Sequence, residues 1–269
     1  LMRRDFTVNA MAMDRSGRLY DAFDGLSDIA GKRLRTVGEA KERFSEDALR
    51  LFRACRFVAQ LDFMADSSLV EGMESAFPRV SGLSLERVRS EVDRLLVAAH
   101  AARGMDLMVR SGLAGCSCRM KEKGTYTEVP ILPELSHLVG LPQQKEFHKY
   151  DAWYHTLAVL EAASPEPLLR WAALLHDVAK GMPGIRAIRK GRLTDYGHDK
   201  KGAEMARAIL TRWRRSPAFT KEVVWLVENH MRFHFFANSP EADAEKWVRQ
   251  LARDRVFSSS EAMAESFLH

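Results

Sequence analysis

The strongest helical pattern of this sequence lies between residues 44 and 58, and it constrains the fold more than any other stretch. Ser45 is placed to cap the N-terminus of the helix, and acidic residues follow it where the positive end of the helix dipole favours carboxylates. Asp47 and Arg50 stand three residues apart and should share one face of the helix. Five apolar residues supply the buried face: Leu49, Leu51, Phe52, Cys55 and Val58.

The polar face of this helix is suited to reading the edge of a nucleotide base. The carboxylate of Asp47 offers hydrogen-bond acceptors, and the guanidinium of Arg50 offers a planar set of donors. Together they can recognise a base without a nucleic-acid template, and Arg53 and Arg56 continue the same face. The alternative interpretation is an ordinary ion pair on a solvated helix.

Four short motifs precede or include this helix in a fixed order. RRDFTVNAMA occupies residues 3–12, DxFDGxxDI residues 21–29, LRTVG residues 34–38 and RFSEDALRLFRACRF residues 43–57. In this order they resemble the motifs of the family of class II tRNA nucleotidyltransferases (CCA-adding enzymes) and bacterial poly(A) polymerases. SLERVRSE at residues 84–91 is similar to the family's later neck motif, so the resemblance covers most of the chain.

The resemblance implies an RNA nucleotidyltransferase that adds CMP and AMP from CTP and ATP to an RNA 3′ end. Completion of the CCA end of tRNA is the favoured reaction, and poly(A) addition is the alternative within the family. The resemblance also implies five nucleotide-binding residues: Arg4 and Asp5 at the triphosphate and ribose, Asp47 and Arg50 at the base edge, and Arg53 near the phosphates.

One departure from the family pattern concerns catalysis. In the family, a Gly-Gly turn and an Asp-x-Asp pair lie upstream of RRDFT, and this sequence contains neither. Those carboxylates would hold the Mg²⁺ ions that clamp the attacking and leaving oxygens. We therefore expect the chain to be a fragment that lacks the catalytic part of the head and has no catalytic residue for nucleotide transfer. Transfer should belong to the full-length protein.

A second group of chemically active residues lies in the C-terminal half. His155 is followed about twenty residues later by His176 and Asp177, and His198 and His230 come further on. A histidine on one helix followed by His-Asp on the next resembles the HD superfamily of metal-dependent phosphohydrolases. The resemblance implies His155, His176 and Asp177 as metal ligands, with His198 and His230 as weaker candidates that would complete a two-metal site.

This set of imidazoles and a carboxylate suits a divalent metal such as Ni²⁺, Mn²⁺, Co²⁺ or Mg²⁺. The metal would polarise a phosphoryl oxygen and lower the pKa of a bound water. In HD domains a late aspartate usually completes the ligands, and the candidates near the end of this sequence are Asp243 and Asp254. Two alternatives follow: an occupied metal centre, or a structural HD domain whose histidines face a groove.

We expect a mainly α-helical chain in four parts. Residues 1–38 form the C-terminal remnant of an α/β nucleotidyltransferase head, with two strand-like segments. Residues 39–118 form a helical neck that selects the nucleotide, including a helix that begins at Ser84. Residues 119–145 form a connector with one short helix, and residues 146–269 form an all-α HD domain.

Composition is that of a soluble globular protein. Of the 269 residues, 46% are hydrophobic and 29% charged, and no apolar run approaches the roughly 20 residues needed to span a bilayer. The net charge of +5 permits a polyanionic partner such as RNA. The three cysteines lack the second pair that a zinc site needs, which favours reduced thiols in a cytoplasmic protein. These features leave the oligomeric state open.

Two other functions compete with nucleotide transfer. An HD phosphohydrolase or phosphodiesterase would use the helical neck as an RNA-binding scaffold, and a catalytically silent RNA-binding fragment is the third possibility. A basic segment before His198 bears on both. It is an expected hairpin around Gly191 that would either contact RNA phosphates or form a solvated turn. Its basic residues are Arg186, Arg189, Lys190 and Arg192.

Overall fold

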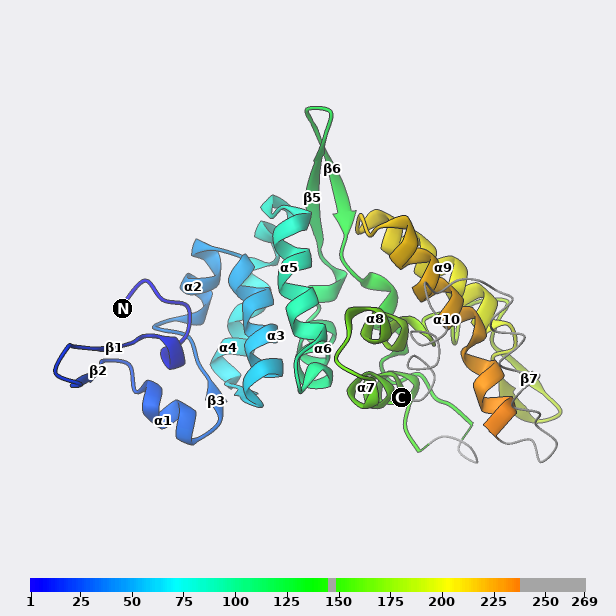
Figure 1. Ribbon diagram of the computed structural model, residues 1–269, viewed down its shortest axis with the longest axis horizontal. Helices are drawn as coiled ribbons and strands as arrows, with labels where there is room; N and C mark the ends of the chain where they lie inside the picture. Colours follow the sequence, from blue (N-terminus) through cyan, green and yellow to red (C-terminus); the bar gives the residue numbers. More distant parts are fainter. Residues whose placement is uncertain (145–148, 238–269) are drawn as a thin grey trace. The chain divides into compact units, whose positions relative to one another are not determined.

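The computed structural model describes residues 1–144 and 149–237. The chain divides into two compact units, unit 1 (Leu1–Ser136) and unit 2 (His137–His269). Helices dominate both units, and every sheet among the described residues has two strands, which confirms the expected mainly α-helical class (Figure 1). No helix in the described ranges is both long and apolar enough to cross a membrane.

The first part of unit 1 contains short helices and strands. They are η1 (Thr7–Asn9), β1 (Met11–Met13), β2 (Leu19–Asp21), α1 (Gly25–Ala30) and β3 (Arg33–Leu34). β1 and β2 form an antiparallel pair, as the two strand-like segments predicted. Asp28 on α1 is fully buried and accepts hydrogen bonds from Thr7, Arg33 and Arg35, so one carboxylate ties this helix to the neighbouring strand.

Two helices replace the single helix expected around Asp47. Helix α2 (Ala40–Glu46) ends just before this residue, and α3 (Leu49–Leu61) begins just after it. The prediction that Ser45 caps the helix is wrong, because Ser45 lies in the last turn of α2. Asp47 has an extended backbone and lies just before Ala48, the N-cap of α3, and its Oδ1 accepts a hydrogen bond from the N–H of Leu49 (3.0 Å), the first residue of that helix.

Helix α3 lies at the centre of the remaining helices of unit 1. The predicted inner residues of α3 are buried, except for the half-buried Leu49. A Cβ atom at Gly104 would lie only 2.5 Å from the carbonyl oxygen of Cys55, so a glycine is needed where α6 crosses α3. Ser84 caps α5 as predicted, its side chain accepting from the N–H of Arg87. The elements are β4 (Met64–Ala65), α4 (Ser67–Met73), η2 (Glu74–Gly82), α5 (Leu85–Leu96) and α6 (Ala101–Arg110).

A β-hairpin occupies much of the segment that was expected to be a connector. After η3 (Leu113–Gly115), strands β5 (Ser117–Glu122) and β6 (Thr125–Pro130) pair in antiparallel register and project away from the helices of unit 1 (Figure 1). Most of their side chains are exposed, which is why an apolar periodicity did not reveal them. The short helix expected near the end of this segment is η4 (Pro133–Leu138).

The described residues of unit 2 are helical apart from one small hairpin. Its elements are α7 (Ala152–Ala162), α8 (Pro167–Leu175), β7 (Ala187–Arg189), β8 (Arg192–Thr194), α9 (His198–Arg212) and α10 (Pro217–Ala237). Helices α9 and α10 pack side by side (Figure 1). Trp153, Trp171 and Trp213 are fully buried, and the last two meet edge to face. This apolar core fixes the helix ends that carry the histidines.

Candidate metal centre and nucleotide-binding cluster

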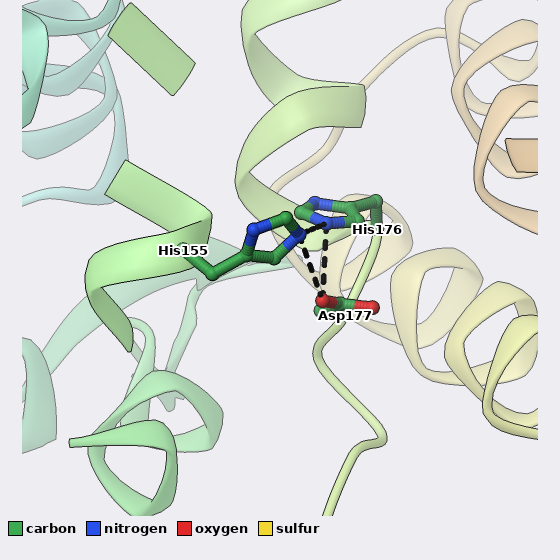
Figure 2. Close-up of side chains that lie close together, drawn as sticks. All are labelled: His155, His176 and Asp177. Carbon is green, nitrogen blue, oxygen red and sulfur yellow. Dashed lines mark hydrogen bonds and ion pairs between the residues drawn. The ribbon is translucent and has the colours of Figure 1, made fainter. Parts of the chain in front are cut away.

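Five predicted residues of unit 2 come together in one place. His155 lies on α7, and His176 and Asp177 directly follow the end of α8, where Figure 2 shows the three side chains converging. His198 is the first residue of α9, and His230 lies on α10. We call these five residues the HD cluster. Asp243 and Asp254, the candidates for a late ligand, lie outside the described residues.

Asp177 stands at the centre of the HD cluster, between two groups of histidines. Its Oδ2 lies 3.5 Å from Nε2 of His155 and 3.1 Å from Nε2 of His176. Its Oδ1 lies 3.3 Å from Nε2 of His198 and 3.7 Å from Nε2 of His230. Each group could hold one metal ion, since its potential ligand atoms all lie within 4.8 Å of one another. The carboxylate would then bridge the two ions.

Backbone carbonyls fix the orientation of three imidazoles. Nδ1 of His176 lies 2.8 Å from the carbonyl oxygen of Ala173. Nδ1 of His198 and of His230 each lie 2.7 Å from a carbonyl oxygen three residues earlier. A carbonyl can only accept, so each Nδ1 carries the proton and a neutral ring has its lone pair on Nε2. The nitrogen atoms that face Asp177 are therefore the ones whose lone pairs are available to a metal.

The contacts inside the HD cluster are poorly satisfied by the protein alone. Nε2 of His155 lies 3.3 Å from Nε2 of His176, and the same pair of atoms in His198 and His230 is 3.1 Å apart. Neither carboxylate oxygen of Asp177 receives a hydrogen bond of regular geometry, although both are buried. Buried polar atoms normally find a partner. A cation between the nitrogen and oxygen atoms would satisfy them, so the residues present fit a divalent metal.

Lys180 is a member of this site that the motif did not reveal. Its Nζ lies 2.8 Å from Oδ2 of Asp177 and donates a hydrogen bond of 2.8 Å to Gln143. Burial alone would raise the pKa of Asp177, but His176, His198 and Lys180 hold it well below its usual range. The spacing of three residues on one turn could have signalled the pair. Asp177 is therefore a carboxylate near neutral pH.

The histidines differ in their exposure to solvent. His155 is half-buried, whereas His176 and His198 are buried. Burial lowers the pKa of His230 to about 4, and the neighbouring His176 adds to the effect. His230 is thus neutral at physiological pH, as a metal ligand must be.

The predicted nucleotide-binding residues lie together in unit 1. Asp47 and Arg50, which were predicted to act as a pair, have different partners. Asp5 is buried and accepts hydrogen bonds from Asn9 (2.8 Å) and from Nε of Arg53 (2.5 Å). Burial would raise the pKa of Asp5, but Arg53 and Asn9 hold it below its usual value. Arg4, which directly precedes Asp5 in the chain, is exposed.

Asp47 and Arg50 do not form the ion pair that was the alternative interpretation. Nη1 of Arg50 instead donates to Glu46 (2.6 Å), and Nη2 donates to the carbonyl oxygen of Arg3 (3.1 Å). Oδ2 of Asp47 pairs with Nη2 of Arg87 at 3.1 Å. Arg50 and Arg53 thus both connect α3 to the RRDF segment. We call Arg4, Asp5, Asp47, Arg50 and Arg53 the nucleotide cluster.

Two residues of the neck motif support this cluster and were not predicted as part of it. Arg87 holds Asp47, as described above. Glu91 lies one turn further along α5 and pairs with Nε of Arg56 at 2.6 Å, with both side chains buried. Arg56 also donates to Gln60 (2.5 Å). The buried pair fixes α3 against α5 and so the position of the predicted base-reading residues.

Three families match successive parts of the chain. Residues 1–35 match the Poly A polymerase head domain, and residues 62–115 match the probable RNA and SrmB-binding site of polymerase A. Residues 152–256 match the HD domain. The order is the one that the sequence motifs predicted.

The chain is also similar to curated CCA-adding enzymes. The chain is 40% identical over 218 residues to a CCA-adding enzyme of Streptococcus pyogenes serotype M1, an alignment that covers 76% of this chain and 51% of the relative. A second CCA-adding enzyme, from serotype M2 (strain MGAS10270), is 39% identical over the same length. The chain thus spans about half the length of the curated relatives it matches.

Solved structures agree on the fold. The crystal structure of the Bacillus stearothermophilus CCA-adding enzyme in complex with CTP is similar with a TM-score of 0.50 and 26% identity, over 88% of this chain and 58% of that one. A tRNA-processing enzyme in an apo form has a TM-score of 0.55 at 18% identity, over 99% of this chain and 62% of that one. This second likeness concerns the fold alone.

Proposed function

Because the chain belongs to the family of class II tRNA nucleotidyltransferases and bacterial poly(A) polymerases, we propose that the whole protein adds CMP and AMP to the 3′ end of tRNA. CTP and ATP are the substrates and tRNA is the partner. The observation that carries the proposal is the nucleotide cluster, in which α3 and the RRDF segment are joined by Arg50 and Arg53. A cytoplasmic location suits this substrate, and the three free cysteines are compatible with it.

The contacts of the nucleotide cluster suggest a role for each residue. Arg4 and Asp5 would contact the triphosphate and ribose, and Arg53, held by Asp5, would lie near the phosphates. Asp47 and Arg50 would bond the base edge, each after exchanging its present partner, Arg87 or Glu46. The Mg²⁺ ions of nucleotide transfer are expected on the Asp-x-Asp pair of the family's head, so no bond-forming step is assigned to residues of this chain.

The test uses the whole protein and a tRNA that ends before its CCA sequence. With CTP, ATP and Mg²⁺, we expect the addition of C, C and A and then a stop. Continued addition of A with ATP alone would instead identify a poly(A) polymerase. No addition with any nucleotide would contradict the proposal.

The HD cluster supports a second candidate activity, the metal-dependent hydrolysis of a phosphate ester. The observation that favours it is the buried carboxylate of Asp177 between two groups of histidines whose Nε2 atoms face one another. A bound metal would supply a Lewis acid and a hydroxide near neutral pH. His155 and His176 would hold one ion, His198 and His230 the other, and Asp177 both. Lys180 balances the charge of Asp177 and directs its carboxylate.

Metal binding tests this second activity directly. The chain, stripped of metal by a chelator, is titrated with Ni²⁺, Mn²⁺, Co²⁺ or Mg²⁺ in a calorimeter, and hydrolysis of a nucleoside 2′,3′-cyclic phosphate and of a terminal phosphate is then measured. We expect two ions per chain and slow, metal-dependent hydrolysis. A high-resolution crystal map without metal after soaking in excess Ni²⁺ would indicate that the HD domain is a scaffold for RNA.

A further inference from the structure

The β7–β8 hairpin concentrates positive charge at its turn. Arg189 and Arg192 are direct partners across the two strands, with Lys190 and Gly191 forming the turn. Lys190 also adopts the left-handed conformation (φ 50°), which is strained for a residue with a side chain. The end of the hairpin thus presents three basic side chains that a polyanion can contact.

The β5–β6 hairpin provides an internal comparison. Its turn has the same two residue types, Lys123 and Gly124, and both have positive φ angles. The pair that flanks its turn is Glu122 and Thr125, which do not carry like charges. The like-charged pair of the β7–β8 hairpin is therefore no consequence of the Lys-Gly turn.

Exposed aromatic and apolar side chains accompany this charge. Tyr196 is 66% exposed and Ile188 is 77% exposed. The guanidinium carbon of Arg189 lies 5.1 Å from the centre of the Tyr196 ring. A ring with a cation beside it is a platform on which a nucleic-acid base can stack while the cation contacts a phosphate.

The hairpin is anchored to the HD cluster by Asp195. Arg186 donates two hydrogen bonds to this carboxylate, from Nε (3.0 Å) and from Nη2 (2.7 Å), and the N–H of Gly181 donates a third (2.9 Å). The carbonyl oxygen of the same Asp195 accepts from Nδ1 of His198 (2.7 Å). One residue therefore holds both the base of the hairpin and a predicted metal ligand.

Chain geometry limits the distance between the aromatic platform and the HD cluster. Tyr196 precedes His198 by two residues, so their Cα atoms are at most about 7 Å apart. On the other side, the exposed Tyr154 directly precedes the half-buried His155. A strand that stacks on Tyr196 would bring its next phosphate close to the histidines.

We propose that the β7–β8 hairpin and Tyr196 bind the last nucleotides of an RNA strand whose terminal phosphate enters the HD cluster. Arg189, Lys190 and Arg192 hold the phosphates of the strand, and Tyr196 stacks on a base. The proposal deepens the second candidate activity and rests on it, since it names an RNA strand rather than a free nucleotide as the substrate. It is distinct from the nucleotide cluster of unit 1.

The test compares two substrates that end in the same group, a nucleoside 2′,3′-cyclic phosphate and an RNA hexamer with a 2′,3′-cyclic end. The variant carries Arg189→Ala, Lys190→Ala and Arg192→Ala. A matched control carries Arg119→Ala, Lys121→Ala and Lys123→Ala, which removes the same number of charges from the other hairpin. We expect KM for the hexamer to rise at least about 10-fold in the first variant only, because salt-sensitive phosphate contacts are lost.

The remaining parameters separate binding from chemistry. In the first variant, kcat for the hexamer and KM for the mononucleotide should stay unchanged, and the salt dependence of the hexamer KM should weaken. Tyr196→Ala should raise the hexamer KM several-fold, and Tyr196→Phe should not, because a phenyl ring still stacks. An equal rise of KM for both substrates would overturn the proposal and indicate that the hairpin acts on the metal ligands.

A binding measurement keeps the proposal testable if the HD cluster proves inactive. Should the unaltered chain hydrolyse neither substrate, the second candidate activity fails. A 4-thiouridine hexamer is then cross-linked to the chain, and the attached peptide is identified by mass spectrometry. Cross-links at residues 186–196 that disappear in the first variant would support RNA binding by the hairpin. Cross-links confined to unit 1 would overturn it.

Discussion

The two clusters of this chain treat their charges in opposite ways. In the nucleotide cluster four of the five charged side chains have a partner of opposite charge: Asp5 with Arg53, Arg50 with Glu46, and Asp47 with Arg87. In the HD cluster the carboxylate of Asp177 pairs with Lys180, but imidazole faces imidazole at 3.1 and 3.3 Å. The first cluster is satisfied without a ligand, and the second is not.

The difference teaches what a ligand has to do at each place. A nucleotide must exchange existing ion pairs at a partly exposed surface, so only the net gain over those pairs contributes to binding. A metal ion at the HD cluster would fill a gap between preoriented nitrogen and oxygen atoms. Backbone carbonyls already hold three of the imidazoles in this orientation before a metal binds. We therefore expect large effects in unit 2 and smaller ones in unit 1.

The largest effect should come from removing the shared carboxylate. Asp177→Ala takes a ligand from both predicted metal positions, so we expect metal affinity and hydrolysis to fall by at least about 100-fold. Calorimetric titration with Mn²⁺ and an assay of cyclic phosphate hydrolysis measure this. The far-ultraviolet circular dichroism spectrum should keep its helical shape, because the helices are held by the buried tryptophans.

The chain offers a matched control in its second His-Asp sequence. Asp199 follows His198 as Asp177 follows His176, but it belongs to neither potential metal group among the described residues. Asp199→Ala should therefore leave metal binding unchanged. A similar loss in both variants would mean that the contrast between the clusters is not a contrast in ligand geometry.

Ligand-induced stabilisation sharpens the same contrast. Mn²⁺ at 100 times its dissociation constant should stabilise the folded state by about 2.7 kcal/mol for each bound ion. CTP at 100 times its own constant gives the same figure in principle, but it should require a much higher concentration, because it must displace ion pairs. Differential scanning calorimetry over a range of both ligands measures the concentrations needed. Equal concentrations for the two ligands would contradict the distinction.

Base selection is the next largest effect. In the whole protein, Asp47→Ala or Arg50→Ala should reduce the preference for CTP and ATP over UTP and GTP, with each lost bond worth about 1–3 kcal/mol. Arg87→Ala should act in the same direction but less strongly, because Arg87 only holds Asp47. Primer extension with each nucleotide alone measures the preference. Unchanged selection in the Asp47→Ala and Arg50→Ala variants would indicate that these two residues form structural ion pairs and do not read the base.

Much of this organisation could be predicted from the sequence, because it depends on motifs whose members are close together or have characteristic spacing. The five residues of the HD cluster belong to this class, and so does the cap of α5 at Ser84. Apart from the nearby Asp177–Lys180 pair, the contacts of the two clusters that escaped prediction include ones that join distant residues. Arg87 meets Asp47 from forty positions away, and nothing local in the sequence specifies that pair.

The missed local features have a different cause. Ser45 and Asp47 are both good helix caps, and propensity alone cannot decide between them. In the structure it is the side chain of Asp47 that accepts from the N–H of Leu49, and the expected helix is divided into α2 and α3. The β5–β6 hairpin escaped because its exposed strands lack an apolar face, although its Lys123-Gly124 turn was a usable signal.

The smallest expected effect concerns the buried carboxylate of the nucleotide cluster. The pKa of Asp5 is below its usual value in the folded state, so its contribution to stability is complete above the unfolded pKa of about 3.9 and is lost as the pH falls through the folded value.

Asp5→Asn removes the charge that Arg53 contacts. The partner is partly exposed, so the loss should be only about 1 kcal/mol near pH 7. Urea unfolding of the original chain and the variant between pH 3 and 7 measures the difference, with the exposed Asp24→Asn as control. The difference should shrink as the pH falls below about 3.9, because the unfolded chain then binds a proton that the folded carboxylate still resists. A difference that stays constant down to pH 3 would show that the shape of Asp5, rather than its charge, connects α3 to the RRDF segment.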